Sequence, residues 1–357
     1  MGCGGAIAMD LEADNQHHYV EQICLIQLNV GGEQWLVDPL AGLDPGPLLE
    51  VLSRRDLILH GGDYDLRLLG RGHGFRPKGV FDTMLAAQLL GWSETGLRAV
   101  ARRTCGVALP KDGQRANWSR RPLTEELIEY AANDTRYLGR IEAGLRAQLE
   151  EAGRLEWHRE SCRRLVAQAS DWSANEPAEA WRIKGSGNIE GLGAAVLKEL
   201  WMWREEMARQ RDRPPFKVAS GKFLLHWANW AAQGAPMAEG ARPERPKWLK
   251  GSMRAAFDAA LDRALSMPEA HWPCESERAQ VEVLERSEKA MLKRLMKARD
   301  RRAQELGLDP GVLGPRQALK ELVRHREVAG RRRSKASGLM AWQLEILWPE
   351  AERVFRE

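Results

Sequence analysis

The sequence predicts an α/β domain with a mixed sheet, followed by helical domains without strands. In the first third of the chain, short apolar runs of strand length alternate with amphipathic helical segments. After about residue 172 the strand signals end, and charged helical patterns continue to the end of the chain. A length of 357 residues is enough for two or three domains. We expect a domain at 1–172, a linker at 173–188, and helical domains at 189–273 and 276–357.

Three strand segments are expected near the start of the chain. Ala6–Glu12 begins almost at the first residue, and Ile23–Leu28 and Gln34–Val37 follow it. The connection between the last two passes through Gly31 and Gly32. It is short enough for a hairpin, so these two strands are expected to be antiparallel.

The next segments alternate between helix and strand signals. In order, the sequence predicts a helix at 48–53, a strand at 57–60, a helix from about 63, helices at 82–90 and 94–104, a loop at 110–122, and one uninterrupted helix at 124–149. Thr124 is the expected N-cap of that long helix, and Glu125 and Glu126 occupy its first turn, where negative charge is favoured. A long basic amphipathic helix is expected at 278–306.

Composition indicates a cytoplasmic protein that does not enter a membrane. Its net charge is +4, and no run of 18 apolar residues or export leader is visible. The chain has five scattered cysteines and no Cys-x-x-Cys pair. This pattern predicts neither a disulfide framework nor a zinc site, and it suits a reducing compartment.

Two acids on the first strand are candidate site residues. Asp10 and Glu12 are two positions apart, so the strand period places both carboxylates on one face of the sheet. In a low-dielectric setting they would repel each other unless a cation or solvent compensated their charge. Taken alone, the pair is also compatible with a solvated strand face.

A third acid lies in the stretch 60–66, where a strand ends and a helix begins. The sheet edge at this point is where ligands tend to bind, and two glycines permit close backbone approach. Asp63 and Asp65 are both candidates, and the phase of the leucines that follow favours Asp65. Either aspartate could instead be a helix-start acid favoured by the helix dipole.

The fourth acid and a tyrosine belong to the long helix. Tyr130 and Asp134 are four residues apart and therefore share one helix face. Alone, this spacing also fits a core tyrosine with an aspartate at the rim.

Together these segments resemble the DEDD 3′→5′ exonucleases. In order they are Asp10-x-Glu12, Cys24–Leu28, His60–Asp65, Phe81–Ala87 and Tyr130-x-x-x-Asp134. The tyrosine resembles that of the DEDDy branch, and the stretch Trp118–Leu123 resembles ribonuclease D and the exonuclease subunit of the nuclear exosome. The resemblance covers roughly residues 5 to 150 and implies an RNase H-like mixed sheet with flanking helices. Asn117 and Arg136 depart from the residues common in that group.

The resemblance implies hydrolysis assisted by two divalent cations. Asp10 would bridge the ions, with Glu12 and Asp134 binding the ion on the nucleophile side. Asp65 would bind the other ion, and Tyr130 would orient the attacking water. Four converging carboxylates cannot all ionise without cations between them. Their oxygen ligands suit Mg²⁺ or Mn²⁺ better than zinc.

The second half of the chain resembles small nucleic-acid-binding helical modules. Leu197–Val218 looks like the helicase-and-RNase-D C-terminal (HRDC) domain, and Leu295–Val323 is similar to a second, divergent copy of it. The candidate nucleic-acid contacts are His60, Arg204, Arg209, Arg211 and Arg213. A solvated, charged helical surface is the alternative interpretation.

These features predict a metal-dependent 3′→5′ exoribonuclease that releases 5′-mononucleotides. By resemblance, its substrates would be the 3′ ends of stable RNA such as tRNA precursors. Two alternatives are a 3′→5′ DNA exonuclease acting in repair and a non-catalytic nucleic-acid-binding protein. The complete set of four acids and one tyrosine argues against the non-catalytic alternative.

Overall fold

The computed structural model describes most of the chain, namely residues 5–110, 113, 116–170, 179–233, 242–273, 284–328 and 332–356. The chain forms two compact units. The sheet unit comprises Met1–Glu12, Ile23–Trp172 and Val283–Glu357. The helical unit comprises Ala13–Gln22 and Ser173–Glu282. None of the described helices is both long enough and apolar enough to cross a membrane.

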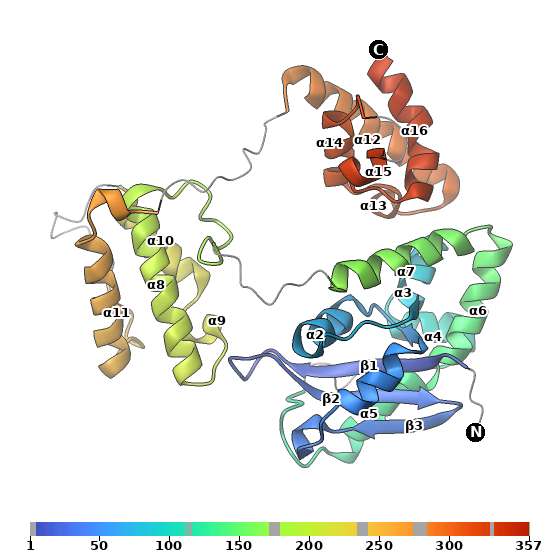
Figure 1. The fold of residues 1–357 in the computed structure, drawn as a ribbon, viewed down its shortest axis with the longest axis horizontal. Helices are drawn as coiled ribbons and strands as arrows, with labels where there is room; N and C mark the ends of the chain where they lie inside the picture. Colours follow the sequence, from blue (N-terminus) through green and yellow to red (C-terminus); the bar gives the residue numbers. More distant parts are fainter. Residues whose placement is uncertain are drawn as a thin grey trace. The chain divides into compact units, whose positions relative to one another are not determined.

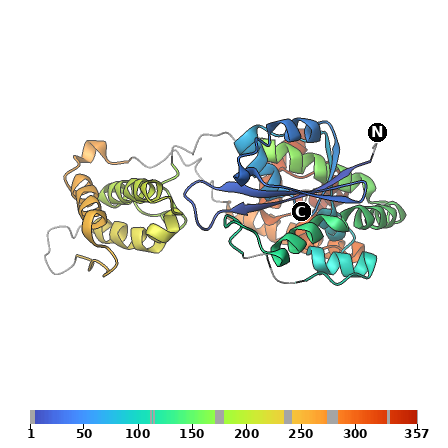
Figure 2. The ribbon, with the colours of Figure 1, turned by 90° about the horizontal axis from the view of Figure 1, so that it is seen from below.

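A five-stranded sheet in the order β3-β2-β1-β4-β5 lies between helices in the sheet unit (Figures 1 and 2). Its strands are β1 (Ile7–Asp14), β2 (Gln22–Val30), β3 (Glu33–Val37), β4 (Asp56–Leu59) and β5 (Gly79–Asp82). β2 and β3 pair in antiparallel fashion, with Leu28 opposite Trp35, so the expected hairpin is confirmed. β1 is parallel to β4, and β4 is parallel to β5. The predicted mixed α/β sheet is therefore present.

Strand β5 was not expected from the sequence. It has only four residues and begins at a glycine, so it carries too little strand signal to be recognised alone. Its register with β4, in which Leu59 faces Asp82, comes from tertiary pairing.

The first part of the sheet unit contains helices near each expected position, and also a 3-10 helix at Pro39–Ala41 and a helix at Leu155–Ser170 that the sequence did not predict. They are η1 (Pro39–Ala41), α1 (Gly46–Ser53), α2 (Asp63–His73), α3 (Thr83–Leu89), α4 (Leu97–Cys105), α5 (Glu125–Arg136), α6 (Leu138–Glu151) and α7 (Leu155–Ser170). The predicted cap of α5 is present, because Thr124 Oγ1 accepts a hydrogen bond from the backbone N–H of Leu127 at 3.3 Å.

The prediction of one uninterrupted helix at 124–149 was wrong. The chain leaves helical geometry at Tyr137, whose φ is −106° and ψ −4°, so α5 and α6 are separate helices. Buried residues continue at helical spacing across the break, from Ala131 to Leu138 and Ile141. The spacing of the buried residues therefore does not reveal that α5 ends and α6 begins here.

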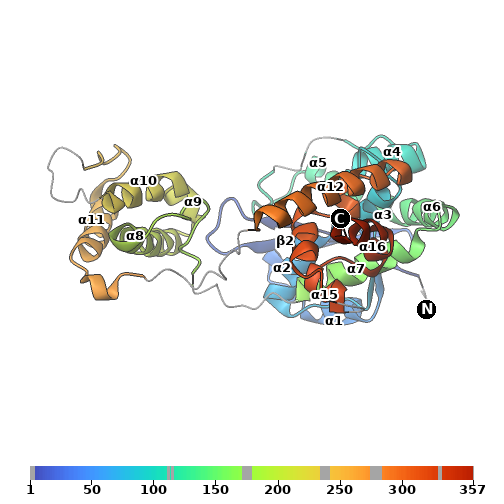
Figure 3. The ribbon, with the colours of Figure 1, turned by 90° about the horizontal axis from the view of Figure 1, so that it is seen from above.

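The last helices of the chain pack onto the first part of the sheet unit (Figures 1 and 3). They are α12 (Arg286–Leu306), α13 (Pro310–Leu313), α14 (Arg316–Arg324), α15 (Arg332–Ser337) and α16 (Ala341–Arg356). Residues 278–283 of the expected helix at 278–306 lie outside the described residues. Trp157 of α7 and Trp342 of α16 stack with ring centroids 4.8 Å apart and belong to the same hydrophobic core.

Polar contacts fix the same packing. Arg154 donates hydrogen bonds to the carbonyl oxygens of Leu89 at 2.7 Å and of Leu306 at 2.5 Å. At Gly91, φ is +76°, and a Cβ atom would lie 1.8 Å from the carbonyl oxygen of Gly307. Only glycine permits this close backbone approach. These last helices therefore share the core of the sheet unit, although residues 173–282 separate them from it in sequence.

The helical unit is built around tryptophans. Its helices are α8 (Gly191–Gln210), α9 (Pro215–Val218), α10 (Gly221–Ala232), α11 (Gly251–Leu265) and η2 (Glu269–His271). Trp203 and Trp227 both meet Phe257 edge-on, at centroid distances of 5.1 Å and 5.0 Å. Trp181 and Ile189 are also buried in this core. The part of the expected linker that is described, from residue 179, therefore packs against the helices.

Replacing Trp342 by alanine should destabilise the sheet unit by about 3–5 kcal/mol. The change removes a buried ring that stacks on Trp157 and leaves a cavity between α7 and α16. Urea unfolding of the full chain would measure the loss. The matched control is Trp35→Ala on β3, where the residue is 54% exposed, and there about 1 kcal/mol or less is expected. Equal losses in the two variants would contradict the shared core.

Candidate active site

Strand β1 presents two acids on one face. Asp10 and Glu12 are half-buried, whereas Met9 and Leu11, which alternate with them, are buried in the core. This alternation is the one predicted from the strand period.

Asp82 fixes the loop that leads into α2. Its carboxylate accepts hydrogen bonds from the backbone N–H groups of Gly61 at 3.2 Å and Gly62 at 2.9 Å. It also caps α3, accepting from Met84 at 2.9 Å and Leu85 at 3.0 Å. Asp82 is only 1% exposed and holds two segments together. This role was not predicted from the sequence, although an aspartate directly before a helix is a recognisable N-cap signal.

Helix α2 then carries Asp65 towards the other acids. Asp65 is 8% exposed, and the charges of Asp10 and Asp82 act on it. Asp63 points to solvent instead, with its side chain 49% exposed and paired with Arg67. The structure therefore brings Asp65, and not Asp63, to the acid cluster.

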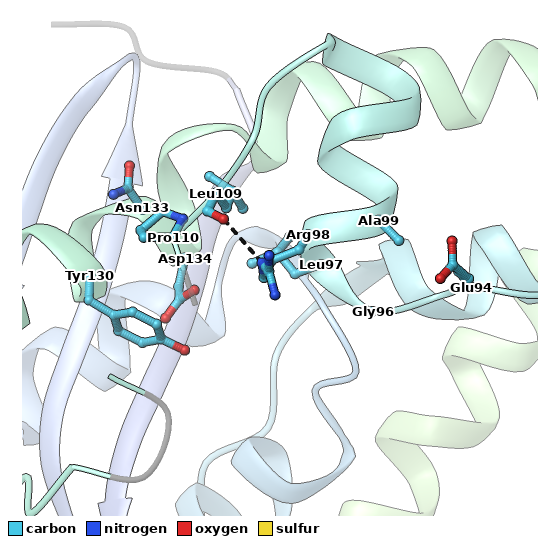
Figure 4. Close-up of a pocket in the computed structure, with 10 residues that line it drawn as sticks. All are labelled: Glu94, Gly96, Leu97, Arg98, Ala99, Leu109, Pro110, Tyr130, Asn133 and Asp134. Carbon is cyan, nitrogen blue, oxygen red and sulfur yellow. Dashed lines mark hydrogen bonds between the residues drawn. The ribbon is translucent and has the colours of Figure 1, made fainter. Parts of the chain in front are cut away.

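Helix α5 supplies the remaining acid and the tyrosine, which lie side by side in Figure 4. One carboxylate oxygen from each of Asp10, Glu12 and Asp134 lies within 4.8 Å of the other two. Three acids from two elements thus meet closely enough to share a cation.

The cluster suppresses the ionisation of its own acids. Burial raises the pKa of Asp10 to about 7 and that of Asp134 to about 8. Burial, followed by the charges of Asp10, Asp134 and Asp65, raises the pKa of Glu12 to about 9. Burial also raises the pKa of Asp65 well above its usual range. At neutral pH the full set of carboxylates can ionise only if cations supply the missing charge.

Tyr130 keeps its proton at neutral pH. Burial, together with the nearby charges of Asp134 and Glu12, raises the pKa of its phenol above the ordinary value. Its ring lies 6.0 Å from the buried ring of Trp118. At Gly113, φ is +132°, and a Cβ atom would lie 2.4 Å from the tyrosine ring, so only glycine fits there. Neither the role of Gly113 nor its need for glycine was apparent in the sequence.

His60 lies in the loop that Asp82 holds. Its Nδ1 atom is 2.8 Å from the hydroxyl of Thr83, and burial lowers its pKa. The two departures from the family pattern lie outside the acid cluster. Asn117 accepts hydrogen bonds from Ser119, and Arg136 pairs with Glu129.

The four candidate arginines belong to the helical unit. They are Arg204, Arg209, Arg211 and Arg213. The side chain of Arg204 is only 11% exposed and forms an ion pair with Glu205 at 2.8 Å. The other three are exposed and therefore offer more to a partner.

A cavity of about 570 Å³ opens beside Tyr130 and Asp134 (Figure 4). Besides these two residues it is lined by Glu94, Gly96, Leu97, Arg98, Ala99, Leu109, Pro110 and Asn133. Asp134 is the member of the acid cluster that reaches its wall. The cavity thus extends from Tyr130 and Asp134 to the first turn of α4, and its volume is in the range of small-ligand sites.

A mixed sheet that brings acids and a protonated tyrosine together agrees with a nuclease that uses divalent cations. The sequence model of a 3′-5′ exonuclease family matches residues 2–150, and that of the HRDC domain matches residues 193–229.

Two similar proteins show the family to which the chain belongs. The chain is 31% identical to a ribonuclease D of Pseudomonas paraeruginosa over 322 residues, which is 89% of this chain and 84% of that protein. It is 30% identical to a ribonuclease D of Desulfotalea psychrophila over 331 residues, 89% of this chain and 85% of the relative. The chain belongs to the ribonuclease D family. The predicted family and the predicted enzyme class, a 3′→5′ exoribonuclease, are confirmed.

A solved structure shares the fold. The crystal structure of Escherichia coli RNase D, described as an exoribonuclease involved in structured RNA processing, is 24% identical with a TM-score of 0.72. The match covers 98% of this chain and 93% of that one. Use of divalent metal follows from the exonuclease family and agrees with the acidic cluster.

Asp65→Asn and Asp63→Asn form a matched pair of variants on one helical turn. Loss of the Asp65 carboxylate should lower kcat on RNA by at least about 10³-fold, because a buried member of the cation site is removed. Asp63→Asn removes an exposed acid paired with Arg67 and should retain most of the activity. Steady-state kinetics with a labelled RNA would compare them. The assignment would be overturned if Asp63→Asn were the inactive variant.

Added Mg²⁺ should stabilise the protein more at about pH 8 than at about pH 5. The pKa of Glu12 rises from its ordinary 4.5 to about 9 on folding. In metal-free protein, the stability that this group contributes is therefore present below pH 4.5 and lost as pH rises towards 9. Cations relieve this loss at high pH, whereas protons compete with them at low pH.

Thermal melting in EDTA and in Mg²⁺ at the two pH values would measure the effect. Glu12→Gln is the control and should flatten the pH dependence in EDTA, because it removes an acid whose pKa is raised to about 9. The same Mg²⁺-induced shift at both pH values would contradict the cation site.

Proposed function

We propose that Asp10, Glu12, Asp65 and Asp134 bind two divalent cations, Mg²⁺ or Mn²⁺, and that this site removes 5′-mononucleotides one at a time from the 3′ end of RNA. The meeting of three carboxylates within 4.8 Å, with their pKa values raised by burial, carries the proposal. Every ligand offered is a carboxylate oxygen, the donor type that these hard cations prefer. When bound, such ions activate water and stabilise the leaving 3′ oxygen.

The residues of the chain have separate tasks in this reaction. Asp10 lies beside each of the other acids and would be the shared ligand. Tyr130 donates its phenolic proton in a hydrogen bond that orients the attacking water. It does not act as a base, because its pKa is raised further above neutral. The packing of Gly113 and Trp118 against its ring supports this orienting role.

The substrates that we propose are 3′ extensions on folded RNA, such as tRNA precursors. The relatives named ribonuclease D and the Escherichia coli enzyme of structured RNA processing support this assignment. We propose that the expected domain at 189–273 holds the folded part of the RNA through exposed Arg209, Arg211 and Arg213. Such contacts bind phosphates without reading sequence.

We assign a different role to the expected domain at 276–357. Its described helices share one core with α7 and the sheet, which supports a divergent HRDC-like module whose task is to stabilise the sheet unit. A reducing cytoplasm is the location we propose, and the free thiols of Cys105 and Cys162 support it.

Digestion of a tRNA-like hairpin with a 3′ tail would test the proposed activity. With Mg²⁺ or Mn²⁺, a 5′-labelled RNA should shorten stepwise from its 3′ end, and a 3′-labelled RNA should release a labelled 5′-mononucleotide. EDTA should stop both. A matched DNA of the same sequence should be degraded more slowly if 2′-hydroxyl groups are recognised. Release of oligonucleotides, or faster loss of the DNA, would overturn the proposal.

Tyr130→Phe in the same assay should lower kcat by roughly 10²–10³-fold, since one positioned hydrogen-bond donor is removed. RNA and metal binding should be retained. Tyr137→Phe is the matched control, because this tyrosine lies beyond the end of α5 and does not line the cavity. Equal kcat values for Tyr130→Phe and the parent protein would refute the orienting role.

A further inference from the structure

One guanidinium stands in the wall of the cavity beside the acid cluster. Arg98 lies in the first turn of α4 and lines this cavity together with Tyr130 and Asp134 (Figure 4). Its Nε atom donates a hydrogen bond to the carbonyl oxygen of Leu109 at 3.0 Å, which fixes the plane of the group. This residue was not predicted from the sequence.

Among the described residues, the two terminal nitrogens of Arg98 form no hydrogen bond and remain available to a ligand. Within the described part of the chain, no carboxylate forms an ion pair with this exposed arginine. Arg102, one turn further along α4, does not line the cavity. An arginine that is held through Nε and presents its Nη groups beside a cavity suits a phosphate, which accepts two parallel hydrogen bonds.

The start of α4 adds to this preference for an anion. Gly96 is the N-cap and provides no side-chain hydrogen bond, so backbone N–H groups of the first turn remain without that cap. The same glycine lines the cavity. Apolar walls at Leu97, Leu109 and Pro110 complete a site that can hold a nucleotide by its base or sugar and by its phosphate.

The shape of the site indicates which phosphate would reach Arg98. Tyr130 and Asp134 line the cavity, whereas Asp10, Glu12 and Asp65 do not, so most of the cavity lies beside the reacting linkage. In a substrate with a free 3′ hydroxyl, the terminal nucleotide carries only the phosphate that reacts. Every other phosphate lies on its 5′ side. A phosphate next to the reacting one must therefore belong to the second linkage from the 3′ end.

We propose that Arg98 binds the phosphate of the second linkage from the 3′ end of the RNA, and so selects substrates that extend beyond the nucleotide being removed. This inference rests on the proposed function of the acid cluster. It adds a substrate-binding residue outside the acids and the tyrosine.

Two short RNAs that differ in one charge would test the proposal. Both carry a 2′-deoxyribose at the second linkage from the 3′ end. This linkage is a normal phosphate in one RNA and a neutral methylphosphonate in the other. The measured quantity is the ratio of kcat/KM for the first cleavage of the charged RNA to that of the neutral RNA. For the parent protein we expect a ratio of roughly 10 to 100, the effect of a charge-assisted hydrogen bond.

Four variants distinguish the effect of the positive charge of Arg98 from the effect of its packing. Arg98→Ala should bring the ratio close to one. Arg98→Gln should do the same, although it keeps a donor that can reach Leu109. Arg98→Lys should retain part of the ratio, because it keeps the charge. Arg102→Ala removes the same charge from the same helix and should leave the ratio as in the parent protein.

The measured ratios can overturn the proposal in the following ways. A ratio near one in the parent protein, or a ratio that Arg98→Ala leaves unchanged, would overturn the proposal. Equal slowing of both RNAs by Arg98→Ala would show that the residue supports the structure and does not bind this phosphate. If the parent protein cleaves neither these RNAs nor an all-phosphate RNA with Mg²⁺ or Mn²⁺, the proposed function of the acid cluster fails instead.

Discussion

The burial of several carboxylates beside one another is the constraint on which the active site depends. Asp10, Glu12 and Asp134 are close enough to share a cation, and burial raises the pKa of each into or above the neutral range. Such an arrangement is unfavourable in the protein alone, since desolvated like charges oppose one another. The cations that offset this cost also supply the chemistry of phosphodiester hydrolysis. The scaffold must therefore hold acids together that would otherwise separate.

Contacts made by residues other than the catalytic acids hold the scaffold in place. The carboxylate of Asp82 receives four backbone N–H groups and joins the loop before α2 to the start of α3. Gly113 packs directly against the ring of Tyr130. Behind α7, the helices at the end of the chain close the core by stacking Trp342 on Trp157. The part of the chain furthest in sequence from Asp10 thus supports the sheet that carries it.

The two kinds of cation around the site act at different ranges. Metal ions would act on the reacting phosphate, whereas Arg98, which lines the cavity beside Asp134, would bind the neighbouring phosphate. The exposed arginines of the helical unit are proposed to bind RNA phosphates. Contacts of this kind follow the RNA backbone and do not depend on base sequence. An exonuclease that removes successive nucleotides needs such recognition, since every step presents a different base.

The sequence by itself determined the parts of this protein that depend on local spacing. The period of a strand placed Asp10 with Glu12, the period of a helix placed Tyr130 with Asp134, and the cap at Thr124 followed from its side chain. Features that depend on contacts distant in sequence were decided only by the tertiary structure. Strand β5 forms because β4 pairs with it, and α5 ends at Tyr137 while the apolar spacing continues. The last helices join the sheet unit through complementary packing across residues 173–282, which no local pattern encodes.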